Sequence, residues 1–191
     1  MIRAFLAVEL PDALRQDLAA LQATLRESGA DVKWVEPANL HVTLKFFGEI
    51  DDTRIPSLSA ALEPVLRPIV PFPIRFGGLG AFPSSASPRV IWVGISSGVE
   101  ALVALARAVE GACASCGFPP DTHPFAAHLT IGHVRAPKHL ATLSHRIQTT
   151  RFQDDRQVAV TQVTLFRSIL SASGPTYLPL GTMTLEGKAA E

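Results

Sequence analysis

The sequence predicts an α+β protein with two lobes, each made of a sheet and its helices. Its 191 residues suit one domain, or two small lobes that pack closely together. Hydrophobic residues make up 47% of the chain, which is enough for a substantial core. Segments with strand periodicity and with helix periodicity intermix along the chain, and hairpin-like turns join some of them. One short motif also occurs in each half, so the lobes are expected to be pseudo-symmetric within a single domain spanning residues 1–191.

The first half predicts three strands and two helices. After Pro11 and Asp12, leucines recur every three or four residues and form the apolar stripe of an amphipathic helix. Gly29 is its expected end, and Gly48 is the expected end of the third strand. The expected strands are residues 2–9, 32–35 and 40–47, and a second helix is expected after Asp51 and Asp52, to about residue 66.

The second half predicts five strands and two helices. Residues 77–88 are rich in Gly, Ser and Pro and are expected to form a long loop between two strands. A turn is expected at residues 171–175. The expected strands are residues 72–76, 89–95, 126–134, 157–168 and 177–185, and the expected helices are residues 99–116 and 138–148.

The charge balance argues against one class of nucleic-acid-binding protein. Lys and Arg together number 17, as do Asp and Glu, so the formal net charge is zero. A protein that coats long nucleic acids needs many phosphate contacts, so this balance argues against that role but allows recognition of one phosphate or an RNA end.

No apolar run approaches the ~20 residues of a membrane span, and the first nine residues are too short for a signal peptide. We therefore expect a cytoplasmic protein that does not bind membranes. A monomer is expected as well, although no sequence feature indicates it.

The cysteines and histidines do not predict a metal or redox site. Cys113 and Cys116 form a C-x-x-C pair late in an expected helix, whereas a redox pair normally opens one. No second cysteine pair completes a zinc site. The histidine spacings do not match metal-binding pairs on a helix. No metal and no cofactor is expected.

The most informative motif is His-x-Thr-x, with x apolar. It occurs as His41-Val-Thr43-Leu and as His128-Leu-Thr130-Ile, about half a chain length apart. Alternate residues of a strand point to the same side, so each motif places an imidazole beside a hydroxyl. The residues that alternate with them are expected to face the core, and in the first strand these are Leu40, Val42, Leu44 and Phe46.

Two such motifs permit acid/base chemistry at a phosphate. Histidine exchanges protons near neutral pH, so one imidazole can accept a proton from an attacking water while the other donates one to the leaving oxygen. Each threonine hydroxyl can donate a hydrogen bond to a non-bridging phosphate oxygen. A single His-x-Thr-x could be an ordinary strand with polar residues on its solvent side, but two copies in matching strand contexts favour function.

With these two motifs the chain resembles the 2H phosphoesterases, and among them the bacterial RNA 2′,3′-cyclic phosphodiesterases, also called 2′-5′ RNA ligases. The resemblance runs from end to end. Beyond the two motifs, it is carried by Arg3-Ala-Phe-Leu-Ala-Val, Trp34-Val-Glu-Pro37-Ala-Asn39-Leu40, Pro88-Arg-Val-Ile-Trp92-Val-Gly94 and Leu165-x-x-Ser168 with Gly174-Pro175-x-Tyr177. It implies antiparallel sheets lining a catalytic cleft, and metal-free hydrolysis of a terminal cyclic phosphate to a 2′-phosphate.

The resemblance also implies roles. His41 would be the proton donor and His128 the proton acceptor, with Thr43 and Thr130 as phosphate ligands. The substrate would be RNA with a 2′,3′-cyclic phosphate end, such as a tRNA fragment, and reversible 2′-5′ joining could use the same site. A 2H esterase for a small cyclic nucleotide-type phosphate and a noncatalytic RNA-end binding module remain alternatives.

Three further residues are candidates for substrate binding. Lys45 has the strand parity of His41 and Thr43, Phe82 lies in the expected loop and could stack on a base, and Arg135 could bring charge.

The chain departs from the family pattern around its second motif. Ala126-Ala127 precedes it where the family has a basic residue or His and then Pro, and His133 stands where the family has Arg. Strand parity places His133 opposite His128 unless a bulge intervenes.

Overall fold

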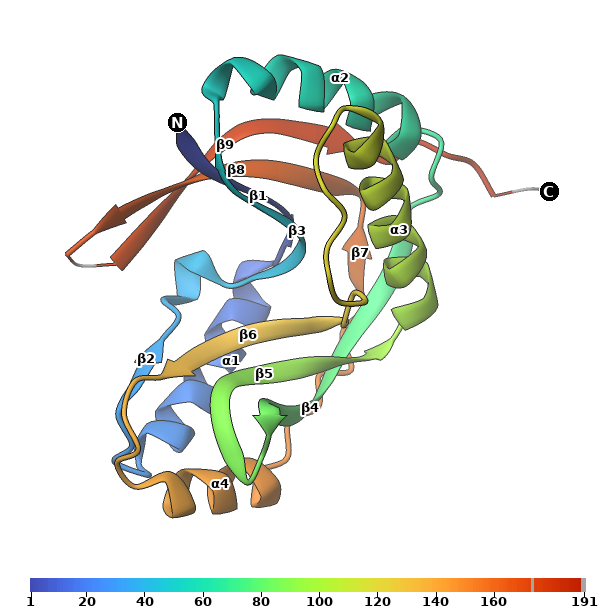
Figure 1. Ribbon diagram of the computed structural model, residues 1–191. Coiled ribbons are helices and arrows are strands. Elements are labelled where there is room, and N and C mark those ends of the chain that lie inside the picture. The colour runs from blue at the N-terminus through green and yellow to red at the C-terminus, as the bar shows by residue number, and fades with distance from the viewer. Residues whose placement is uncertain (173, 190–191) are drawn as a thin grey trace.

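In the computed structural model, which describes residues 1–172 and 174–189, the chain forms two antiparallel sheets with helices packed around them (Figure 1). The strands are β1 (Ile2–Glu9), β2 (Val32–Trp34), β3 (His41–Ile50), β4 (Phe72–Ser84), β5 (Ser87–Ser97), β6 (His128–Val134), β7 (Val158–Val160), β8 (Gln162–Ser171) and β9 (Gly174–Thr184). The helices are α1 (Asp12–Arg26), α2 (Ile55–Leu66), α3 (Val99–Ser115) and α4 (Leu140–Thr149), with short 3-10 turns η1 (Pro37–Asn39) and η2 (Asp52–Arg54). The predicted two-lobed α+β fold is confirmed.

The two sheets are not built from the two halves of the chain. The first sheet has the order β3-β1-β8-β9, and the second has the order β2-β6-β5-β4-β7. The early strand β2 thus pairs with β6 in the second sheet, while the late strands β8 and β9 complete the first. The two lobes are therefore interleaved along the sequence.

The helices cover the two sheets in pairs. In Figure 1, α2 and α3 lie over the first sheet, and α1 and α4 lie against the second. The leucine stripe of α1 is buried as expected, and each fully buried leucine contributes roughly 1.5–3 kcal/mol. Within the described residues, one cluster of buried apolar side chains includes members from both sheets and all four helices. The lobes thus share a core.

The expected loop at residues 77–88 is wrong, because β4 and β5 extend through it as a hairpin. Gly80 of this hairpin is needed for close packing against Trp92. A Cβ on Gly80 would lie 2.3 Å from the Trp92 ring, so only glycine lets the strand pass beneath this indole. Gly78, with φ +81°, accompanies an irregularity in the strand register.

Two other expected boundaries are wrong. Gly48 does not end β3, which continues to Ile50 with Gly48 at φ +69°. The expected strand at residues 157–168 is two strands, since β7 pairs with β4 in the second sheet and β8 pairs with β1 in the first. The expected turn at residues 171–175 joins β8 to β9, and Ser173 within it lies outside the described residues.

The strands that carry the two motifs meet where the sheets adjoin. β3 is an edge strand of the first sheet, and its neighbour across the junction is β6. β2 pairs only with Gly132–Val134 at the end of β6, so it does not cover the part that holds the second motif. The fold thereby brings together two motifs that are far apart in the sequence.

Candidate active site

Each histidine of the repeated motif is the first residue of its strand. His41 opens β3 and His128 opens β6. Within each motif the expected alternation is present, since the histidine and threonine are partly buried and the residues between them are fully buried. Thr43 of the first motif and His128 of the second line one pocket of about 380 Å³. This pocket places groups from both motifs around one space.

Each of the two imidazoles is held by an equivalent contact with a main-chain carbonyl. Nδ1 of His41 lies 2.7 Å from the carbonyl oxygen of Asn39, and Nδ1 of His128 lies 2.7 Å from that of Ala126. A carbonyl oxygen only accepts hydrogen bonds, so Nδ1 carries the proton in each ring. Nε2 is therefore the atom of each ring that is left to gain or lose a proton.

His41 sits against aromatic rings. Phe5 stacks on it at 4.7 Å between ring centroids, and the edge of Tyr177 meets it at 5.4 Å. Phe5, Ala7 and Phe166 form a small apolar cluster with Tyr177, separate from the main core. Burial lowers the pKa of His41; the hydrogen bond to the Asn39 carbonyl acts in the opposite direction, and the charge of Arg15 lowers the pKa further. His41 is thus predominantly neutral at pH 7 in the free protein.

His128 has aromatic neighbours of its own. Phe82 meets its ring edge-on at 5.1 Å, and Trp92 lies 5.4 Å from Phe82. Phe82 is 37% exposed, so its ring is open to solvent beside the histidine. It belongs to the end of β4 and not to a loop, and it has the position that a base-stacking residue would need.

A β-bulge lies at the last residue of each motif. In the first sheet Thr43 pairs with Ala7 but Lys45 pairs with Leu6, so Leu44 is an extra residue. In the second sheet Thr130 pairs with Trp92 but Gly132 pairs with Ile91, so Ile131 is extra. Each bulge reverses the alternation of the residues that follow it.

The bulges correct two expectations. Phe46 does not face the core: it is 46% exposed, stacks on Phe5 at 6.0 Å, and has the Arg3 guanidinium over its ring. His133 is exposed and, since the bulge intervenes, lies on the same side of β6 as His128. The strand parity that placed it opposite is wrong. Phe46 and His133 occupy equivalent positions after their motifs.

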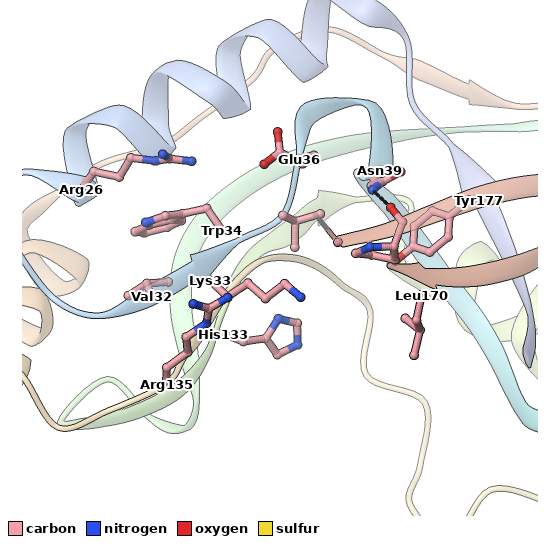
Figure 2. Close-up of a pocket in the computed structure, with 13 residues that line it drawn as sticks. Arg26, Val32, Lys33, Trp34, Glu36, Asn39, His133, Arg135, Leu170 and Tyr177 are labelled. Carbon is pink, nitrogen blue, oxygen red and sulfur yellow. Dashed lines mark hydrogen bonds between the residues drawn. The ribbon is translucent and has the colours of Figure 1, made fainter. Parts of the chain in front are cut away.

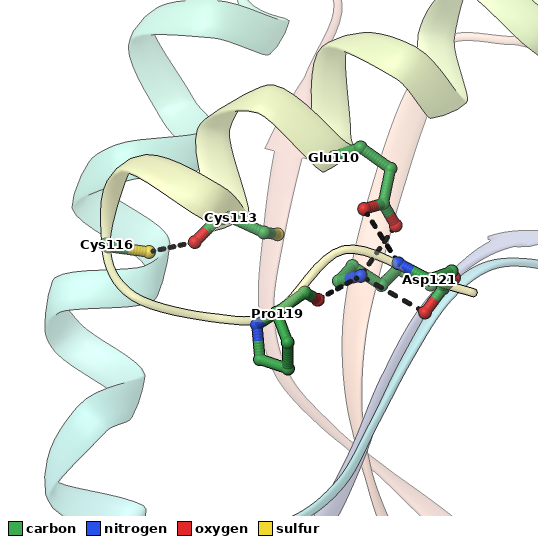
Figure 3. A network of polar contacts seen from close by, with 6 residues as sticks. Glu110, Cys113, Cys116, Pro119 and Asp121 are labelled. Atoms are coloured by element: carbon green, nitrogen blue, oxygen red, sulfur yellow. Dashed lines mark hydrogen bonds and ion pairs between the residues drawn. The ribbon is translucent and has the colours of Figure 1, made fainter.

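The expectation that Lys45 shares the side of His41 is also wrong. Its side chain is only 2% exposed, and its ammonium contacts Glu110 at 2.6 Å, Asp121 at 3.3 Å and the Pro119 carbonyl at 3.2 Å (Figure 3). Burial by itself would lower the pKa of Lys45, but the hydrogen bond and charge of Glu110 and Asp121 outweigh it and raise the pKa. Lys45 therefore ties β3 to the segment between α3 and β6.

Arg135 lies beyond the end of β6 and lines a second, larger pocket together with His133 and Tyr177. Phe5 and Tyr177, which contact His41, were not among the candidate site residues. Tyr177 is the chain's single tyrosine and closes the last stretch that carries the family resemblance, and this was the available signal. Phe5 lies in Arg3-Ala-Phe-Leu-Ala-Val, which also carries the resemblance, but its apolar neighbours in the sequence are those of a core residue.

The cysteine pair lacks the reactive thiol that a redox site needs. Cys113 is buried, and burial raises its pKa to about 12, so its thiol stays protonated. Cys116 donates to the Cys113 carbonyl, as Figure 3 shows. Within residues 1–172 and 174–189, no three His, Cys, Asp or Glu side chains are grouped to hold a metal ion. Nor does any helix of these residues have the length and apolar character to cross a membrane.

Comparison with known proteins agrees with the repeated motif. The family model described as LigT like Phosphoesterase matches twice, at residues 8–92 and 93–177. A relative from Methanothermobacter thermautotrophicus, called RNA 2′,3′-cyclic phosphodiesterase, is 35% identical over 96% of this chain and 99% of its own. A relative of the same description from Archaeoglobus fulgidus is 36% identical over 94% of this chain and 98% of its own.

Solved structures have the same fold. A crystal structure of a protein from Thermus thermophilus superposes with a TM-score of 0.83, at 28% identity, over 98% of this chain and 100% of that one. Escherichia coli LigT complexed with 3′-AMP superposes with a TM-score of 0.76, at 25% identity, over 96% of this chain and 98% of that one. The two matches of the family model, the full-length relatives and the two motifs together show that the chain belongs to the LigT-like phosphoesterase family of 2H phosphoesterases.

Proposed function

We propose that this protein hydrolyses the 2′,3′-cyclic phosphate at an RNA end to a 2′-phosphomonoester. The observation that carries the proposal is the pocket of about 380 Å³ that Thr43 of the first motif and His128 of the second both line. The relatives described as RNA 2′,3′-cyclic phosphodiesterases support the same substrate. Cyclic phosphodiester hydrolysis needs one proton acceptor and one proton donor, which two imidazoles supply.

The proposed reaction has one displacement at phosphorus. Nε2 of His128 accepts a proton from water as the water oxygen bonds to phosphorus. The bond from phosphorus to O3′ breaks, and O3′ takes a proton from Nε2 of His41. The Thr43 and Thr130 hydroxyls donate to the non-bridging oxygens, where negative charge increases. The product carries a 2′-phosphate and a free 3′-hydroxyl.

The charge state of His41 follows from substrate binding. A donor must be protonated, yet burial favours the neutral ring in the free protein. A phosphate anion beside the ring favours the charged imidazolium and so raises its pKa. Substrate binding therefore favours the protonated form of His41, which is the form that can donate a proton.

The same site supports 2′-5′ joining. If a 5′-hydroxyl of a second RNA replaces water, the same displacement leaves a 2′-5′ phosphodiester, and the reverse step restores the cyclic phosphate. The tRNA-fragment substrate, the monomeric state and the cytoplasmic location stay predictions.

The test is turnover of an oligonucleotide that ends in a 2′,3′-cyclic phosphate, with a chelator present. His41→Ala and His128→Ala should each lower kcat by roughly a hundredfold or more, the usual contribution of general acid/base catalysis. His145→Ala, an exposed histidine of α4, is the matched control and should retain full activity.

Three outcomes would contradict the proposal. Full activity of either active-site variant would remove its histidine from the reaction. Loss of wild-type turnover on adding chelator would show that a metal takes part. Tight binding of the oligonucleotide without turnover by the wild type would instead support a noncatalytic RNA-end binding module.

A further inference from the structure

A second pocket, of about 510 Å³, lies beside the active site and is called the basic pocket here (Figure 2). One wall comes from α1, β2 and the end of β6, and the other comes from β8 and β9. Its volume is within the range of small-molecule and nucleotide sites. Its basic lining residues are Arg26, Lys33, His133 and Arg135, and its apolar lining residues include Trp34, Leu170, Pro175 and Tyr177.

Positive charge is concentrated on one wall of the basic pocket. Arg26, Lys33 and Arg135 line it against a single acidic residue, Glu36, although the whole chain has no net charge. None of these three cations forms an ion pair with another part of the chain that the structure describes. All three are exposed. They are therefore available to a phosphate.

The opposite wall offers flat and apolar surfaces. In Figure 2, Leu170 and Tyr177 lie across the pocket from Lys33 and Arg135. Trp34 lies on the basic side with the Arg26 guanidinium over its ring at 5.7 Å. Aromatic and apolar surfaces of this kind bind nucleobases without requiring a particular sequence. The pocket thus combines phosphate-binding and base-binding groups.

Residues that line the basic pocket also contact His41 or lie on the strand of His128. Tyr177 contacts the His41 ring, and His133 is on the same strand and the same side as His128 and Thr130. Asn39, which also lines the pocket, accepts the His41 Nδ1 hydrogen bond through its carbonyl and donates through Nδ2 to the Pro175 carbonyl at 2.7 Å. An RNA chain whose cyclic-phosphate end lies at the two histidines can therefore continue into the basic pocket.

We propose that the basic pocket binds the nucleotide that precedes the cyclic-phosphate nucleotide of single-stranded RNA. Its phosphodiester would contact Lys33 and Arg135, and its base would lie between Trp34 and the wall of Leu170 and Tyr177. This inference rests on the proposed function, and it makes the enzyme prefer an RNA end over a free nucleoside cyclic phosphate. Charged donors to a phosphate supply the affinity.

The test compares adenosine 2′,3′-cyclic phosphate with a trinucleotide that has the same terminal residue. In the wild type, kcat/KM is expected to be higher for the trinucleotide. In the double variant Lys33→Gln/Arg135→Gln, the ratio of kcat/KM for the trinucleotide to that for the mononucleotide should fall roughly tenfold or more, through KM, as two charged phosphate contacts are lost. Arg151→Gln, an exposed arginine outside the pocket, should leave the ratio unchanged.

Binding measurements separate this inference from the proposed function. The Kd of a fluorescent trinucleotide that ends in 2′-phosphate is measured by anisotropy for the same variants. If the wild type shows no turnover but the double variant loses affinity for the trinucleotide, RNA binding by the basic pocket is supported and the proposed function is contradicted. An unchanged substrate ratio with unchanged trinucleotide affinity, or equal losses on both substrates, would overturn the pocket.

Discussion

At the scale of single residues, the two histidines are prepared by their main chain. Each Nδ1 donates to the carbonyl two residues earlier, so the side chain at that position has no part in the contact. Ala126, which departs from the family pattern, therefore serves as well as Asn39 does before the first motif. The sequence predicted the residue types of the site, but not these hydrogen bonds, because every residue type carries a carbonyl.

The pH dependence of the reaction should report the environment of His41. As the proposed donor it must be charged, so kcat/KM should fall as pH rises through its lowered pKa in the free protein. Bound phosphate raises that pKa, so the fall of kcat should come at higher pH. Rate profiles for both parameters check this order. Falls at the same pH, or in the reverse order, would contradict it.

A variant sharpens this pH prediction. Arg15 lowers the pKa of His41 by its charge, so Arg15→Gln should move the fall of kcat/KM toward higher pH. Arg151→Gln, outside the pocket that Arg15 and His41 line, is the control and should leave the profile in place.

At the scale of elements, the two bulges determine which side chains reach the site. Strict alternation predicts Lys45 beside His41 and His133 away from His128, and the extra residues Leu44 and Ile131 reverse both. A bulge depends on the register with a partner strand, which a single sequence does not show. The shared side of the His and the Thr in each motif could be predicted because both residues precede the bulge.

Different groups support the two bulges on the core side. Lys45 makes its ion pairs beneath the first. Beneath the second, the buried amide of Gln22 donates to the carbonyls of Val35 and Ile131 at 2.7 and 2.9 Å. Gly132 has the position equivalent to Lys45, and a Cβ there would lie 2.9 Å from Val32. The close packing of β2 thus requires glycine where the first motif has lysine.

Lys45→Met should reduce both stability and kcat. It removes a buried charge partner of Glu110 and Asp121, which should cost about 1–3 kcal/mol because these carboxylates are partly exposed and regain water. It also frees the segment that leads into His128, so kcat should fall while KM changes little. Urea unfolding and steady-state kinetics measure the two effects.

The double variant Lys45→Met/Glu110→Leu tests whether the ion pair is responsible. It should lose less stability than the sum of the two single variants, because they remove one interaction. Additive losses, or a Lys45→Met variant with unchanged kcat, would show that Lys45 does not position the second motif.

At the scale of the whole molecule, the helices and most strands could be predicted, whereas the sheet order could not. The leucine stripes of α1 and α2 are local patterns that short segments reveal. The pairing of β1 with β8 joins Arg3–Ala7 to Thr164–Ser168, across most of the chain, and no local pattern shows it. The junction of β3 and β6 that assembles the site depends on such pairings.

The neutral molecule should recognise only the last few nucleotides of RNA. Because the chain has no net charge, a longer RNA should gain little from sequence-independent phosphate contacts beyond those of the basic pocket. KM should fall from the mononucleotide to the trinucleotide and stay within about twofold for longer single strands. A length series at fixed salt measures this, and a KM that keeps falling with length would contradict it.

The interleaved sheets also constrain how the protein is made. β1 and β3 are synthesised before β8 and β9, and their sheet gains these two strands only after β4 to β7 have been made. Contacts between such distant segments form slowly, because a long intervening chain must be closed first. The nascent chain therefore carries His41 on an incomplete sheet until β8 and β9 have been synthesised and have paired with β1.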